Sequence, residues 1–126
     1  MRSVIKDNND AGVAAVVNQQ FDIGLQILDA GLVPIIEPEV DIHSATKAEI
    51  EESLRDTLAA SLDRVPEGKQ VVFKLSLPSQ ANFYSPLIDH PKVMRVVALS
   101  GGYSRDEACT MLAANHAMIA SFSRAL

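Results

Sequence analysis

A single lysine, Lys74, interrupts an otherwise apolar run, QVVFKLSL, at residues 70–77. Lysine is rarely buried unless its position has a use, and burial disfavours the charged ammonium. The free amine is a nucleophile that attacks ketones and aldehydes to give a Schiff base. The alternative is an outward-pointing lysine that extends its amine to solvent. Strand alternation predicts that Lys74 lies on the face opposite to Phe73 and Leu75.

Two glutamates, Glu37 and Glu39, follow the apolar run LVPII at residues 32–36. Because side chains alternate along an extended chain, both carboxylates should share one face, with Pro38 stiffening the backbone between them. Two carboxylates at a strand end can divide acid and base roles when their environments separate their pKa values. A pair of solvated loop acids fits the same spacing, which does not decide between the two.

A glycine turn and a later arginine together indicate an anion site. Ser100, Gly101 and Gly102 follow an apolar run and precede a helical pattern, where free backbone N–H groups favour an anion. Ser123 and Arg124 follow the last apolar run. In (β/α)8 barrels, the loops after the last two strands often form a phosphate site jointly. The pairing of the two loops is the stronger signal, since many Gly-Gly pairs are only turns.

The remaining chemically capable residues give weaker signals. Arg2 is a further strand-end candidate, at the start of the chain. The histidines, His43, His90 and His116, are far apart and lack carboxylate or cysteine partners at ligand spacing, so no metal site is predicted. Cys109, the single cysteine, excludes an internal disulfide and is expected to pack in the core.

Short apolar runs alternate with helical patterns along the chain. Strands are predicted at 32–36, 70–77, 93–99 and 118–122, with 1–5 as the tail of a further strand, and helices at 11–30, 47–64 and 105–115. Residues 79–90 are read as a loop with one or two helical turns. Capping-box spacing begins two of the helices, at Thr46 and Ser104. Alternation of this kind indicates βαβ units, in a doubly wound sheet or part of a (β/α)8 barrel.

Composition restricts the class of protein. With 126 residues the chain has room for one domain, and its 48% hydrophobic and 21% charged residues are typical of a globular protein. A net charge of -5 makes nucleic acid and anionic lipid poor partners. No apolar stretch is long enough to span a bilayer, and the N-terminus has no signal-peptide core. We expect a cytoplasmic protein.

Four blocks of the sequence stand out together, namely GLVPIIEPEV (31–40), VVFKLSLP (71–78), VVALSGGYS (96–104) and IASFSRAL (119–126). As a set they resemble one family, the class I fructose-1,6-bisphosphate aldolases in their bacterial form. The resemblance runs in order over the whole chain. It implies a (β/α)8 barrel and a metal-free glycolytic lyase without a cofactor, which cleaves fructose 1,6-bisphosphate to dihydroxyacetone phosphate and glyceraldehyde 3-phosphate.

The resemblance also implies a role for each candidate residue. Lys74 would form the Schiff base, Glu37 would act as acid and base in carbinolamine dehydration and proton transfer, and Glu39 would assist it. The remaining candidates would bind substrate or its phosphate, namely Ser100, Gly101, Gly102, Ser123, Arg124 and Arg2. The vertebrate form has a glycine where Ser123 stands, and a backbone N–H contact survives that change.

The chain length adds a further expectation. A (β/α)8 barrel takes about 250 residues, so residues 1–126 are expected to form one partial barrel domain, from the end of strand four to strand eight. Two alternatives stay open: a non-catalytic half-barrel, or a different Schiff-base sugar-phosphate lyase such as a transaldolase. The expected partners are sugar phosphates and either a second copy of the chain or a first-half barrel segment, with no nucleic acid and no membrane.

Overall fold

The computed structural model describes residues 1–125, in which strands and helices alternate. The elements are β1 (Arg2–Ile5), α1 (Asp10–Asp29), β2 (Ile35–Val40), α2 (Lys47–Ser61), the 3-10 helix η1 (Leu62–Arg64), β3 (Val71–Ser76), α3 (Ser85–Ile88), β4 (Val93–Leu99), α4 (Arg105–Ala113) and β5 (Ile119–Ala120). The five strands form one parallel sheet in the order β1-β2-β3-β4-β5.

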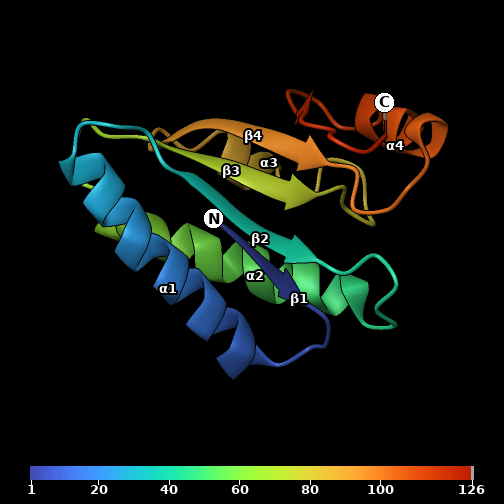
Figure 1. Ribbon diagram of the computed structural model, residues 1–126, viewed down its shortest axis with the longest axis horizontal. Coiled ribbons are helices and arrows are strands. Elements are labelled where there is room, and N and C mark those ends of the chain that lie inside the picture. Colours follow the sequence, from blue (N-terminus) through green and yellow to red (C-terminus); the bar gives the residue numbers. More distant parts are fainter. Residues whose placement is uncertain (126) are drawn as a thin grey trace.

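Strand order in the sheet follows the order of the chain and never reverses. A doubly wound sheet reverses its strand order at a switch point, whereas neighbouring strands of a (β/α)8 barrel succeed one another as they do here. In Figure 1, α1 and α2 lie together along one face of the sheet, and the arrowheads of β1 to β4 point toward the same end. The predicted α/β half-barrel is therefore confirmed, and the doubly wound alternative is wrong.

The core lies between the sheet and its helices. Phe73 and Leu75 of β3 are fully buried and belong to the same apolar cluster as Leu54 and Leu58 of α2. This alternation is the reason that the sequence forms β3, since every second side chain is buried against helices. The opposite face of the sheet leaves large apolar side chains partly exposed, namely Val4, Ile35 and Ile119.

The second strand differs from the prediction in its position. It was expected at residues 32–36, but β2 covers Ile35–Val40, so Glu37 and Glu39 lie inside the strand and not after it. The reason is β1, which pairs with β2 from Arg2↔Glu37 to Ile5↔Val40 and extends the ladder along residues 37–40. Pro38 is tolerated because main-chain pairing of β2 with β3 covers only Ile35 and Ile36.

The predicted helix ends met different outcomes. Gly31 ends the α1 turn with a φ of 81°, a conformation that suits glycine. The capping box of Ser104 and Glu107 is present at the start of α4. The capping box predicted at Thr46 is wrong, because the Thr46 side chain makes no capping bond. The Thr46 N–H donates instead to the Ser44 hydroxyl at 3.3 Å.

The cysteine also differs from the prediction. Cys109 is exposed, so the expectation that it packs in the core is wrong.

No helix within residues 1–125 is long and apolar enough to cross a membrane.

Candidate active site

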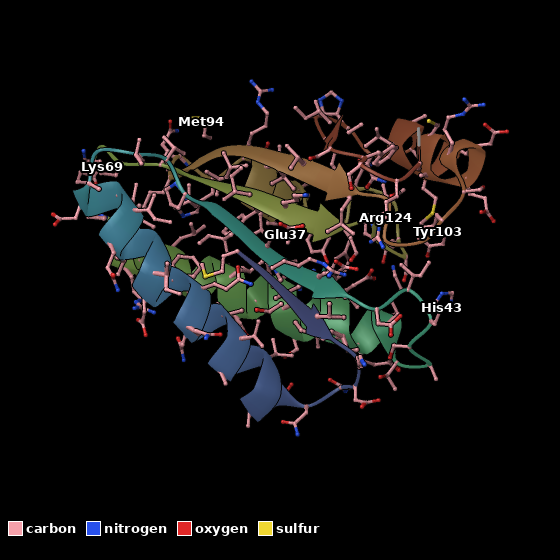
Figure 2. The ribbon with its side chains drawn as sticks, viewed as in Figure 1. Glu37, His43, Lys69, Met94, Tyr103 and Arg124 are labelled. Atoms are coloured by element: carbon pink, nitrogen blue, oxygen red, sulfur yellow. The ribbon has the colours of Figure 1, made fainter. Side chains whose placement is uncertain are left out.

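A cavity of about 350 Å³ opens at the end of the sheet toward which the strands run, and it gathers most of the predicted residues. Its lining comprises Arg2, Glu37, Glu39, Lys74, Leu99, Ser100, Gly101, Ser121, Ser123 and Arg124. Figure 2 shows Arg124 beyond the arrowheads of the strands, while Lys69 and Met94 lie toward the opposite end. Of the predicted set, Gly102 alone does not line the cavity.

Lys74 and Glu37 form a pair across two neighbouring strands. The Lys74 Nζ lies 3.1 Å from the Glu37 Oε1, and the two side chains are 22% and 14% exposed. Lys74 is on the β3 face opposite to the buried Phe73 and Leu75, as alternation predicted, and it is partly open to solvent because that face borders the cavity. An amine and a carboxylate at this distance can exchange a proton directly.

Glu39 has a different partner, although it lines the same cavity. The Arg2 Nε donates to the Glu39 Oε2 at 2.6 Å, and the Glu39 side chain is buried. The hydrogen bond and the negative charge of Glu39 raise the pKa of the Arg2 guanidinium. The two glutamates therefore share a face but not an environment: Glu37 is beside an amine, and Glu39 is held by a guanidinium that is half-exposed at the cavity mouth.

The turn after β4 supplies Ser100 and Gly101 to the cavity lining. Ser100 is buried, and its carbonyl accepts from the Tyr103 N–H at 3.0 Å, which closes the turn. Gly101 has a φ of 62°, and a Cβ there would lie 3.0 Å from the Ile42 side chain. Only glycine combines this conformation with the close approach. The same requirement explains why Gly102, with a φ of 113°, is a glycine although it stays outside the cavity.

The segment after β5 also lines the cavity. Strand β5 covers only Ile119 and Ala120, so Ser121, Ser123 and Arg124 all follow it as an irregular segment. Ser121 was missed because the apolar run predicted a strand through residue 122. Its N–H donates to the Ala98 carbonyl at 2.8 Å, which holds the segment beside β4.

A buried charged network under the same end of the sheet was also missed. Lys47 and Glu51, four residues apart on α2, form a buried ion pair. The Lys47 Nζ also donates to the Leu77 carbonyl at 2.8 Å, and the Ser79 N–H donates to the Glu51 carboxylate at 3.0 Å. Charged residues of a helix that packs on a sheet usually lie on its solvated face. Their i,i+4 spacing was the available signal, but it is shared by many exposed pairs.

Metal-ligating geometry is absent from the described part of the chain. Within residues 1–125, no group of three or more His, Cys, Asp and Glu side chains is arranged to hold a metal ion. The arrangement instead offers an amine beside a carboxylate, a second carboxylate held by arginine, and a glycine turn with an arginine from the segment after β5.

Comparison with known proteins gives relatives over the whole chain. No family model matches the sequence. A protein of Synechocystis sp. named fructose-bisphosphate aldolase class 1 is 56% identical over all 126 residues, and a protein of Porphyromonas gingivalis with the same name is 55% identical over the same length. The chain spans 42% of the length of each of these relatives.

Proposed function

We propose that this chain, which is homologous along its whole length to class 1 fructose-bisphosphate aldolases, carries the imine-forming half of that enzyme's active site. The reaction is the reversible cleavage of fructose 1,6-bisphosphate to dihydroxyacetone phosphate and glyceraldehyde 3-phosphate. One observation carries the proposal. The Lys74 amine lies 3.1 Å from the Glu37 carboxylate, in the cavity that Gly101 and Arg124 also line.

Lys74 is the nucleophile in this proposal. Its uncharged amine attacks the C2 ketone of the substrate, forming a C–N bond and a carbinolamine. Loss of the former ketone oxygen as water gives the protonated imine. This cation accepts the electron pair of the C3–C4 bond as that bond breaks, and the C4 hydroxyl gives up its proton to release the aldehyde. Protonation of the resulting enamine at C3 and hydrolysis of the imine then free dihydroxyacetone phosphate and Lys74.

Glu37 moves the protons of these steps. Its distance from Lys74 lets it take the proton that the nitrogen carries after attack and give it to the leaving hydroxyl of the carbinolamine. Glu39 is buried and bound to Arg2, so it is suited to keep negative charge next to Glu37 and to orient Arg2 toward substrate. Two carboxylates with different partners fit a division of roles between them.

The phosphate is held at the far side of the cavity from Glu37. Gly101 lines the cavity with its backbone alone, next to Ser100, and Arg124 and Ser123 line it from the segment after β5. Backbone N–H groups and a guanidinium are the donors that bind a phosphate dianion in proteins.

The wider context follows from the same proposal. The reaction belongs to glycolysis and gluconeogenesis in the cytoplasm, proceeds without a metal or cofactor, and uses sugar phosphates as its only small-molecule partners. Because the chain spans 42% of its relatives, groups outside it would complete substrate positioning. We expect the 126-residue chain alone to turn over fructose bisphosphate more slowly than its full-length relatives by orders of magnitude.

Trapping the imine tests the proposal. Incubation with dihydroxyacetone phosphate and sodium borohydride should add covalent mass to the purified chain, and peptide mapping should locate it on Lys74. Lys74→Ala should abolish the adduct. Lys69→Ala is the matched control, because Lys69 is exposed at the opposite end of the sheet (Figure 2), and it should keep the adduct. An adduct that survives Lys74→Ala, or no adduct on the wild-type chain, would refute the proposal.

A further inference from the structure

Gln20 is a fully buried polar side chain that the cavity does not include. It lies on α1, among the apolar side chains that pack this helix against the sheet. Its amide makes two hydrogen bonds to one residue of β2: the Glu37 N–H donates to the Gln20 Oε1 at 2.7 Å, and the Gln20 Nε2 donates to the Glu37 carbonyl at 3.0 Å. A buried glutamine is uncommon, and both polar ends of this one are directed at Glu37.

The bonds hold Glu37 at a point where the sheet holds it weakly. Main-chain pairing of β2 with β3 covers only Ile35 and Ile36, and β1 begins at Arg2, directly opposite Glu37. The next residue, Pro38, has no N–H and confines Glu37 to extended backbone conformations. Gln20 fixes the remaining freedom, because it binds the N–H and the C=O of the same residue.

A fixed backbone at Glu37 fixes the direction of its side chain. The carboxylate then reaches across to β3, where its Oε1 lies 3.1 Å from the Lys74 Nζ. A continuous set of contacts therefore runs from α1 through the Glu37 backbone to the reactive amine. Gln20 itself does not line the cavity, so it is not placed to touch substrate.

We propose that Gln20 is a positioning residue, which holds the Glu37 carboxylate against Lys74. Its part in catalysis rests on the proposed aldolase function, whereas the contact that it maintains does not. A purely structural role would cost stability when Gln20 is replaced, without a specific effect on Lys74. The two roles are separated by measuring Lys74 directly on folded variants.

The first measurement needs no substrate. The chain is treated with limiting acetic anhydride, and acetylation of Lys74 is compared with that of exposed Lys69 in the same sample. An amine paired with a carboxylate acylates slowly, so Gln20→Met should raise the Lys74-to-Lys69 ratio severalfold. Gln19→Met, one position along the same helix and exposed, should leave the ratio unchanged.

A second substitution shows whether the effect passes through Glu37. Glu37→Gln should raise the ratio by itself, and adding Gln20→Met to it should bring no further increase. Gln20→Glu supplies a further check, because a protonated glutamic acid offers one donor and one acceptor as the amide does, and an ionised one offers acceptors alone. The ratio for Gln20→Glu should match the wild type at acid pH and depart from it as the pH rises.

The catalytic part is measured by the rate of borohydride-trapped adduct at increasing dihydroxyacetone phosphate. Gln20→Met should lower the limiting rate by about tenfold to a hundredfold, since misplacement by about 1 Å has this effect, while the half-saturating concentration stays within twofold. All variants are compared where circular dichroism shows them folded.

The outcomes separate the two proposals. An unchanged acetylation ratio in Gln20→Met, or an equal further rise in the Glu37→Gln background, overturns the positioning role. If the ratio changes as expected but the wild type traps no adduct, the positioning role stands and the aldolase proposal falls. If the adduct forms and Gln20→Met traps it at the wild-type rate, the catalytic part of the role is overturned.

Discussion

Removing one member of the Lys47–Glu51 pair should destabilise the chain strongly. Lys47→Met keeps the length of the side chain but takes away the cation, which leaves Glu51, 2% exposed, with the Ser79 N–H as its remaining partner. A buried charge that loses its partner costs about 3–5 kcal/mol. The Leu77 carbonyl loses its donor from Lys47 as well. Glu51→Gln should cost a similar amount, because it leaves the Lys47 ammonium buried without a counter-charge.

The double variant should cost far less than the sum of the singles. Replacing both charges with apolar groups is often neutral, so the cost that stays comes from the Leu77 carbonyl and the Ser79 N–H, at about 1–3 kcal/mol for each unsatisfied group. Simple addition of the singles gives about 6–10 kcal/mol. We therefore expect Lys47→Met/Glu51→Met to cost about 2–6 kcal/mol, with a coupling free energy of several kcal/mol.

Urea unfolding followed by circular dichroism gives all four free energies of the cycle. The exposed pair Arg105–Asp106 on α4 provides the control cycle and should show no measurable coupling. A cost below about 1 kcal/mol for Lys47→Met would mean that water reaches Glu51, and it would refute the buried network. Costs that simply add in the double variant would refute the pairing itself.

Three further predictions concern other parts of the molecule. The Tyr84 hydroxyl is buried without a hydrogen-bond partner among the described residues, and burial raises its pKa. Tyr84→Phe should therefore leave the free energy of unfolding unchanged or raise it by about 1 kcal/mol. A clear loss of stability in urea unfolding would contradict this. Hydrogen bonds from Ser104 lower the pKa of Glu107 below its ordinary value of 4.5. The stability that the ionised Glu107 adds is therefore complete above pH 4.5, and it is lost as the pH falls through the lowered pKa. The difference in melting temperature between wild type and Glu107→Gln should accordingly shrink in acid, and a difference that grows there would contradict the capping role. The sheet face that exposes Ile35 and Ile119 should make the chain associate with itself. In analytical sedimentation, Ile35→Glu and Ile119→Glu should each weaken this association. A folded wild-type chain that stays monomeric at high concentration would contradict the prediction.

The sequence predicted the elements of the fold better than their boundaries. The apolar run at 70–77 located β3 within a residue at each end, and the helical pattern at 47–64 located α2. The position of β2 could not be predicted in the same way, because its second half is held by β1 and by single side chains, while Glu37 and Pro38 are residues that strands usually avoid.

The residues of the candidate site that could be predicted from the sequence are those whose type is itself unusual and chemically capable. Lys74 and Arg124 are unusual at their positions, and both line the cavity. Ser121 and the buried Lys47–Glu51 pair carry no such signal, because serine and i,i+4 charge pairs are common on any surface. What decides their role is the tertiary fold, which brings α2 under the end of β3 and shortens β5 to two residues.

The separation of β2 from β3 joins the fold to the candidate site. Main-chain pairing between them ends at Ile36, and in Figure 1 the two strands diverge toward their arrowheads. Farther along, a side chain replaces the missing ladder: the Val40 N–H donates to the Ser76 hydroxyl at 3.0 Å, and that hydroxyl donates to the Val40 carbonyl at 2.8 Å. Ser76 thus bridges the two strands with its side chain and pairs both the N–H and the carbonyl of Val40. Gln20 acts at the other edge of β2, because alternation gives the main-chain groups of Glu37 the direction of the Asp41 N–H, which donates to the Ile5 carbonyl of β1. The two strands therefore part just where the Glu37 carboxylate and the Lys74 amine lie 3.1 Å apart.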